Sequence, residues 1–256
     1  MIKILKKICR TLLIAAFWIL IWGIASHRFG KPLLFPYPHK VFGVLWEMLR
    51  TPQFYQITLH SFLNVFTGVF WGILAACLLV VLTYKFKSVR ELFLPLMSVI
   101  KATPVASFII LAFFFIGSSK TPGFITFLMV FPVIWTNLDE GLRKIDKGLS
   151  EVTRVYQFSP LEKLRYLILP SVQPYFASAC RSALGLAWKA GVAAEIITMP
   201  PDTIGAMIGD AKTYIMTEEM FAWTLTVILL SLLIEFGVGR LLGLLEGRRR
   251  ATREVI

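Results

Sequence analysis

Long uninterrupted runs of apolar residues constrain this chain more than any other feature. The hydrocarbon core of a bilayer requires about 20 mostly apolar residues per crossing helix, and six stretches meet that need. They are residues 10–26, 60–84, 92–116, 122–138, 176–199 and 220–242. No series of short alternating strands is present in the sequence, so an outer-membrane barrel is not expected. The sequence therefore predicts an all-α integral membrane protein with about six transmembrane helices.

The charge of the chain supports a membrane location and predicts its orientation. Of the 256 residues, 57% are hydrophobic and only 16% are charged, below the quarter or so that soluble domains carry. With the N-terminus inside, the inner segments hold 17 lysines and arginines and the outer segments hold 6. This asymmetry predicts that both termini lie inside and that the number of spans is even. It also accounts for the net charge of +12 without nucleic acid.

We expect a single transmembrane domain over residues 1–256. The first apolar run follows a basic start, as in a signal peptide, but we expect it to be retained because the rest of the chain is itself embedded in the membrane. Prolines interrupt residues 30–58, and residues 41–49 between them carry apolar side chains at helical spacing. This pattern predicts a short helix on the membrane surface. The long polar segment, residues 139–173, is predicted to be a cytoplasmic loop.

Residues 139–173 contain two short amphipathic segments. Ser150 is expected to cap the first helix, Ser159-Pro160 to start the second, and Pro170 to end it. The apolar side chains of the first helix share one face: Leu149, Val152, Val155 and Tyr156. Such a helix suits a groove on a partner protein, but it also suits packing against its own bundle. The pattern alone leaves both interpretations open.

The same loop resembles the EAA loop in the permeases of ATP-binding-cassette (ABC) importers. That pattern is E-A-A, three residues, Gly, nine residues, and I-x-L-P. This sequence fits the spacing of that pattern without a gap. Glu151-Val152-Thr153 occupies the E-A-A positions and Gln157 occupies the glycine position. Leu167 occupies the isoleucine position, and Leu169-Pro170 matches the final Leu-Pro. The alanines and the glycine are replaced here. The replaced glycine is expected to alter the turn after the helix that contacts the ATPase.

The resemblance extends over roughly residues 36–245 and is nearest to the nitrate/sulfonate/taurine branch of these permeases. Four stretches carry it: Phe35-Pro36-Tyr37-Pro38, residues 61–66, residues 100–106, and residues 181–195. The resemblance implies the type I ABC importer permease fold and a multi-pass location in the bacterial cytoplasmic membrane. The substrate it implies is a small anion or small organic solute, such as nitrate, a sulfonate, taurine or a vitamin precursor.

The resemblance also implies a set of partners. A second permease subunit, expected to be another copy of this chain, would complete the pathway. An external solute-binding protein would contact the outer segments 117–122 and 200–219, and two ATPase subunits would bind on the inner side. ATP would be bound by the ATPase, so we expect neither a cofactor nor enzymatic activity in this chain, which lacks G-x-x-x-x-G-K-[ST]. The residues expected to couple to the ATPase are Glu151, Val152, Thr153, Arg154, Val155, Tyr156, Gln157, Leu169 and Pro170.

Ionisable residues at membrane depth are costly and are candidates for the substrate pathway. In the fifth predicted span, Arg181 lies about 40° from Glu195 and about 80° from Lys189 around a helix, so all three could face a polar interior. Lys189 is the deepest and is expected to pair with Glu235. The full candidate set is Lys101, Pro104, Arg181, Lys189, Glu195 and Glu235. The alternatives are snorkelling for Lys101 and Arg181 and a structural ion pair for Glu195.

Three residues in these spans have a predicted structural role. Pro104 is expected to kink the third span, because proline lacks the N–H that continues a helix. Gly191 in the fifth span, together with Gly185, is expected to allow close approach of a neighbouring helix. We expect no metal site in the chain.

Two other classes of function remain as alternatives. An ion-coupled secondary transporter is disfavoured by the absence of a visible repeat and by the long loop suited to docking. A membrane-embedded enzyme is disfavoured because the spans carry no paired histidine or aspartate cluster and no Ser/His arrangement. The leading hypothesis is therefore a permease subunit of an ABC importer.

Overall fold

The computed structural model describes the backbone of residues 2–253 and the side chains of residues 9–11, 13–241 and 243. Every element in this part of the chain is helical, which confirms the predicted all-α class. The elements are α1 (Ile2–Phe29), α2 (Pro38–Met48), α3 (Pro52–Lys85), α4 (Lys87–Ala102), α5 (Val105–Ile116), α6 (Thr121–Arg143), α7 (Lys147–Val155), α8 (Pro160–Lys163), the π-helix η1 (Leu164–Ile168), α9 (Leu169–Thr198), α10 (Ile204–Thr213) and α11 (Thr217–Arg253).

Four helices in the described residues are long and apolar enough to cross a membrane: α1, α3, α6 and α11. The pair α4 and α5 qualifies together as a fifth span, although the two helices meet at an angle of 103°. The sequence predicted a span over 92–116 with a kink at Pro104, and the structure divides this stretch into two helices. Thr103 is extended (ψ 132°) before Pro104, because a residue that precedes proline is disfavoured in the helical region. The expected kink at Pro104 is therefore a full break.

The fifth predicted span, 176–199, corresponds to α9, which begins earlier, at Leu169. Pro170 was expected to end the preceding helix, but the chain stays helical through it. The π-turn η1 makes this possible, because the N–H of Leu169 bonds five residues back to the carbonyl of Leu164. α9 is not among the candidate spans, and its charged and small residues lower its mean hydropathy.

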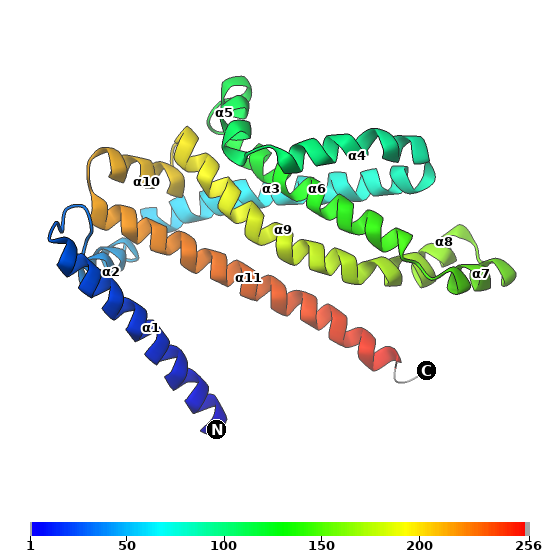
Figure 1. Cartoon of the computed structure of the whole chain (residues 1–256), viewed down its shortest axis with the longest axis horizontal. Coiled ribbons are helices and arrows are strands. Elements are labelled where there is room, and N and C mark those ends of the chain that lie inside the picture. Colours follow the sequence, from blue (N-terminus) through cyan, green and yellow to red (C-terminus); the bar gives the residue numbers. More distant parts are fainter. Residues whose placement is uncertain (1, 254–256) are drawn as a thin grey trace.

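Helix α6 lies between α3 and α9 and forms the centre of the bundle (Figure 1). Glycines bring these helices close together. A Cβ on Gly68 of α3 would overlap the carbonyl oxygen of Gly123 in α6. A Cβ on Gly191 of α9 would lie 2.6 Å from Val65 and 2.8 Å from Thr126. The predicted close packing at Gly191 is therefore confirmed, with α3 and α6 as the neighbours.

The segments predicted to lie on opposite sides of the membrane lie at opposite ends of the bundle. Figure 1 shows α7 and α8 at the right end and α2 and α10 at the left end. The left end is called the outer end below, following the sequence prediction. Some residues that enter the charge argument have side chains outside the described part of the chain: Lys3, Lys6, Lys7, Arg248, Arg249, Arg250 and Arg253. Residues 1 and 254–256 of the predicted domain also lie outside it.

The predicted surface helix at 41–49 is present as α2, which begins at Pro38, a residue suited to the first turn of a helix. Val41 and Leu45 are buried and form part of the main core. Helix α1 is far less covered, since only 6% of its apolar window is buried in the chain. Trp22 of α1 stacks on Phe221 of α11, with ring centroids 5.8 Å apart.

Candidate functional site

Helix α7 is set by local hydrogen bonds at both of its ends. Asp146 caps its N-terminus, because its Oδ1 accepts a 3.0 Å hydrogen bond from the N–H of Leu149. Ser150 was expected to be this cap, and that prediction was wrong: the helix begins one turn earlier, at Lys147. An aspartate at this position satisfies an otherwise unpaired N–H of the first turn.

The apolar face of α7 has nothing to pack on within the described chain. Val155 is 76% exposed and Tyr156 is 73% exposed, and Leu149 and Val152 are about half exposed. Only Thr153 in this helix is buried. An exposed row of large apolar side chains at the end of a bundle is the mark of an interaction surface. The structure therefore favours docking to a partner over packing of this face on the chain itself.

The charged residues of α7 border a hollow between this helix and α8. The hollow has a volume of about 510 Å³, and Glu151, Arg154 and Lys163 line it. Helix α8 begins with a capping box, in which Ser159 and Glu162 bond reciprocally, as the Ser159-Pro160 pair predicted. Hydrogen bonds from the hydroxyl and then the backbone N–H of Ser159 lower the pKa of the Glu162 carboxyl.

The turn after α7 keeps a glycine-like conformation although the residue is Gln157. Its φ is +50°, in the left-handed region. The N–H of Phe158 bonds to the carbonyl of Thr153 (2.9 Å), and the N–H of Gln157 bonds to that of Arg154 (3.2 Å). These two bonds define a Schellman motif, in which glycine is the usual residue with positive φ. The expected change of the turn is thus absent from the backbone, and the replacement appears instead as strain at one residue.

Substituting Gln157→Gly should stabilise this turn, since a side chain at positive φ costs about 1 kcal/mol. Hydrogen exchange of the amides in residues 152–158 should slow about fivefold in the purified protein. The matched control is Gln157→Ala, which removes the long side chain but keeps a Cβ, and it should not slow exchange. Equal exchange in the glycine variant and the wild type would show that the positive φ carries no strain.

The predicted pathway residues of α9 divide into two groups. Arg181 and Lys189 are exposed, and Glu195 is completely buried. Arg181, Gly185 and Lys189 follow one another at intervals of four residues, so they form one stripe along the helix. Glu235 of α11 lies over this stripe, since a Cβ on Gly185 would be 3.0 Å from its Oε1.

The expected ion pair between Lys189 and Glu235 does not form. The ion pairs found between described residues lie elsewhere, and join Lys40 to Glu218, Arg90 and Arg143 to Asp139, and Lys144 to Glu140. Lys189 is therefore an exposed cation in α9 with no carboxylate of the described chain within bonding distance. Helical spacing placed Lys189 and Glu235 on facing helices but did not specify their relative height.

Glu195 is part of a hydrogen-bonded cluster that joins α3, α9 and α10. Its Oε2 accepts hydrogen bonds from the Ser61 hydroxyl (2.8 Å) and the Gly205 N–H (3.3 Å). The Ser61 Oγ in turn accepts from the N–H of Ile204 (2.8 Å), the first residue of α10. The alternative of a structural role is favoured, with hydrogen bonds in place of the ion pair. No pattern in the sequence indicated that the Ser61 hydroxyl and the Gly205 N–H would bond to Glu195.

Lys101 lies at the end of α4, just before the break at Thr103-Pro104. Its Nζ donates a 2.6 Å hydrogen bond to the Thr136 hydroxyl of α6. Pro104 is the N-cap residue of α5. This contact joins the broken span to the central helix, and it brings Lys101 to a helix different from the one that carries Lys189.

An ion pair that the sequence analysis did not anticipate lies near the start of α7. The Arg90 guanidinium of α4 makes a bidentate contact with the Asp139 carboxylate of α6, through Nε (3.0 and 3.1 Å) and Nη2 (2.9 Å). Arg143 bonds to the same carboxylate (3.1 Å). The spacing of Asp139 and Arg143 could have indicated a pair within one helix, but no pattern in the sequence could have indicated Arg90.

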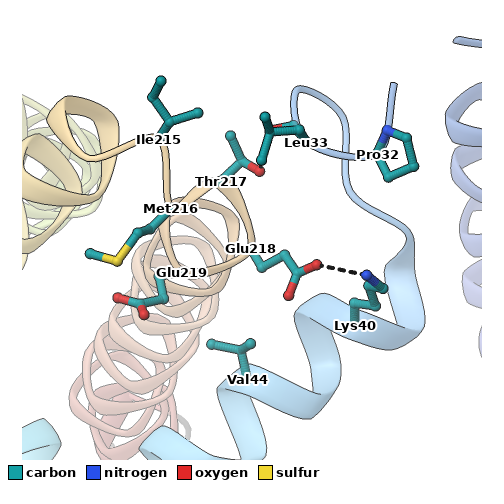
Figure 2. Close-up of a pocket in the computed structure, with 9 residues that line it drawn as sticks. All are labelled: Pro32, Leu33, Lys40, Val44, Ile215, Met216, Thr217, Glu218 and Glu219. Atoms are coloured by element: carbon teal, nitrogen blue, oxygen red, sulfur yellow. Dashed lines mark hydrogen bonds and ion pairs between the residues drawn. The ribbon is translucent and has the colours of Figure 1, made fainter. Parts of the chain in front are cut away.

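At the outer end, a pocket of about 320 Å³ lies between α2 and the start of α11. Figure 2 shows Lys40 of α2 reaching across to Glu218, at an N–O distance of 3.2 Å, with Glu219 beside it. The Thr217 hydroxyl donates a 2.7 Å hydrogen bond to the carbonyl of Leu33. These contacts hold the segment between α1 and α2 against α11.

Comparison with known proteins adds a family to this geometry. Residues 68–251 match the family model of the binding-protein-dependent transport system inner membrane component. The chain is 24% identical over 239 residues to a probable ABC transporter permease protein of Haemophilus influenzae, covering 92% of this chain and 96% of the relative. It is 31% identical over 172 residues to the putative aliphatic sulfonates transport permease protein SsuC of Bacillus subtilis, covering 66% and 58%.

A solved structure supports the fold independently. It is a bacterial ABC transporter involved in the import of the acidic polysaccharide alginate. The TM-score is 0.62 at 15% identity, and the match covers 94% of this chain and 98% of that chain. At 15% identity, this likeness shows the arrangement of helices alone.

Proposed function

We propose a role for this chain that starts from its family: it belongs to the binding-protein-dependent transport system inner membrane components, and so is a non-catalytic permease subunit of an ABC importer. In this proposal the chain forms the solute pathway with a second copy of itself. A separate ATPase, bound at α7, drives transport. The observation that carries the proposal is the uncovered apolar face of α7. A helix with this face suits a groove on the ATPase, with Glu151 and Arg154 at the rim.

The short rigid unit around α7 suits the transmission of force. Asp146 and the turn at Gln157 hold the helix at both ends, and after that turn α8, η1 and α9 form one uninterrupted helical stretch. A displacement of α7 by a closing ATPase would therefore act on α9, which carries the candidate pathway residues. Leu169 and Pro170 lie at the start of α9, where that motion would enter the span.

The exposure of Lys189 supports a second copy and a polar pathway. A lysine at the centre of a helix that faces lipid costs about 3 kcal/mol. Helix α9 is also less apolar than the candidate spans. An aqueous pathway bounded by a second copy of the chain would remove the cost, and an exposed cation there would suit an anionic solute. The relative from Bacillus subtilis is named for aliphatic sulfonates, which are anions.

Substituting Lys189→Glu should therefore lower uptake of an anionic solute by at least about tenfold, because an attractive charge becomes a repulsive one. Lys189→Arg keeps the charge and should retain most of the uptake. The measurement is solute uptake by cells or proteoliposomes that contain the whole importer. Wild-type uptake by the glutamate variant would place Lys189 outside the pathway.

The experiment that tests the proposal as a whole is purification of the tagged chain from its native host. We expect an ATPase to co-purify, and we expect uptake by the reconstituted complex to require ATP and a loaded binding protein. Solute uptake driven by an ion gradient, with no ATPase present, would support a secondary transporter instead. Identification of the ligand bound to the partner binding protein would define the substrate.

A further inference from the structure

An open groove lies between the middle of α3 and the start of α6. Its volume is about 620 Å³. The floor consists of the crossing of Gly68 and Gly123, where the two backbones touch and no side chain stands between them. A groove with a bare backbone floor admits a ligand closely against the helices.

The two ends of the groove differ in chemistry. Ser119 and Lys120 line it where α6 begins, together with Asn64 of α3. Lys120 is exposed and forms no ion pair with any residue that the structure describes. Phe124 and Phe127 line the other end and stack on one another, with ring centroids 6.3 Å apart. The groove is therefore amphipathic, with a single positive charge at its polar end.

The polar end lies within about 6 Å of the outer boundary of the hydrocarbon core. Helix α3 has 34 residues, so it is about 50 Å long, whereas the hydrocarbon core is about 30 Å thick. Counting about 20 residues outward from Lys85 at its inner end places the outer boundary near Val65. Asn64 is next to this boundary. Gly68 lies about 6 Å below Asn64 along the helix, and Trp71, which also lines the groove, lies about 10 Å below it.

The groove faces away from the proposed solute pathway. Ile125 and Met129 of α6 pack against α5 and α9. Phe127 is two residues from each of them, which is about 200° around the helix, and it therefore points to the opposite side. Helix α9, which carries Lys189, and the groove consequently lie on different sides of α6. A surface between α3 and α6 that faces away from α9 is one that lipid covers.

We propose that this groove binds one anionic phospholipid of the outer leaflet. The phosphate lies beside Lys120 and Ser119, and an acyl chain runs along Phe124 and Phe127 over the glycine floor. The positive charge, the polar-to-apolar order along the groove and its depth in the membrane all fit this ligand. The proposal is independent of the substrate and of the partner ATPase.

Native mass spectrometry of the purified full-length chain tests the proposal. Phosphatidylglycerol should bind with higher affinity than phosphatidylcholine, and Lys120→Gln should weaken its binding about fivefold, the value of one basic side chain near an anionic headgroup. The matched control is Lys212→Gln, a change of another exposed lysine at the outer end, which should leave lipid binding unchanged. Equal binding of the two lipids, or no effect of Lys120→Gln, would overturn the proposal.

A second measurement requires no change at Lys120. Phosphatidylglycerol with brominated acyl chains should quench the fluorescence of Trp71, read as the difference between the wild type and Trp71→Phe. Brominated phosphatidylcholine should quench this difference signal less at the same concentration. Equal quenching by the two lipids would contradict the proposal. If taurine, as a soluble sulfonate, restores the fluorescence, the groove is a solute site and the lipid assignment is wrong.

Discussion

Val155→Asp in α7 should abolish ATP-driven solute uptake while the protein still inserts into the membrane. The side chain is 76% exposed in the chain, so the fold does not depend on it. In a complex with the ATPase, the carboxylate would be buried without a partner. Such burial costs about 3 kcal/mol, which weakens binding roughly 100-fold. The measurements are co-purification of the ATPase and ATP-dependent uptake by proteoliposomes.

The control for this variant is Val155→Leu, which keeps an apolar side chain at the same position and should retain both uptake and co-purification. Membrane insertion of all variants is checked by their yield in the detergent-soluble membrane fraction. Normal uptake by Val155→Asp would mean that the exposed face of α7 is not where the ATPase binds. In that case the coupling proposed for this loop would fail.

Gly68→Ala should destabilise the bundle strongly. The new Cβ would overlap the Gly123 carbonyl oxygen and lie 2.7 Å from the Thr126 Cβ, so α3 and α6 must move apart. Overpacking of this kind costs about 3 kcal/mol, and the gain in helix propensity offsets only about 1 kcal/mol. The midpoint of thermal unfolding in detergent should fall by roughly 6 °C.

Gly237→Ala provides the matched control. It makes the same change inside α11, where a Cβ would meet nothing within 4 Å. Only the gain in helix propensity remains, so the thermal midpoint should rise slightly or stay the same. If Gly68→Ala behaves like Gly237→Ala, α3 and α6 do not cross as closely as the structure places them.

The presence of α7 and its apolar face could be predicted from the sequence because their determinants are local. The apolar face of α7 is defined by spacing along one helix, and the capping box of α8 by residues three apart. The start of α7 was misplaced because Asp146 and Ser150 are both good caps, and local propensity does not rank them. The course through Pro170 was missed because a π-turn has no signature in the apolar pattern.

The intramembrane charges show the opposite case. Their presence and spacing indicated a functional region, but each side chain depends on a neighbour that is distant in sequence. Glu195 is buried because it bonds to Ser61, which is 134 residues away in sequence, and to Gly205 in the first turn of α10, which is 10 residues away. Lys189 forms no ion pair with a residue that the structure describes, because Glu235 lies one turn away, over Gly185. The angle of a residue around its own helix does not determine how far along a neighbouring helix its partner lies.

The sequence by itself determined that the chain is a helical membrane protein, where its apolar helices lie, and which loop resembles a site for an ATPase. These properties follow from the solvent that each side chain prefers and from contacts within about one helical turn. Only the tertiary structure decided the angle of the broken span, the burial of Glu195, and the groove over Gly68 and Gly123. These depend on which helices become neighbours, and that choice is made by close packing summed over the whole bundle.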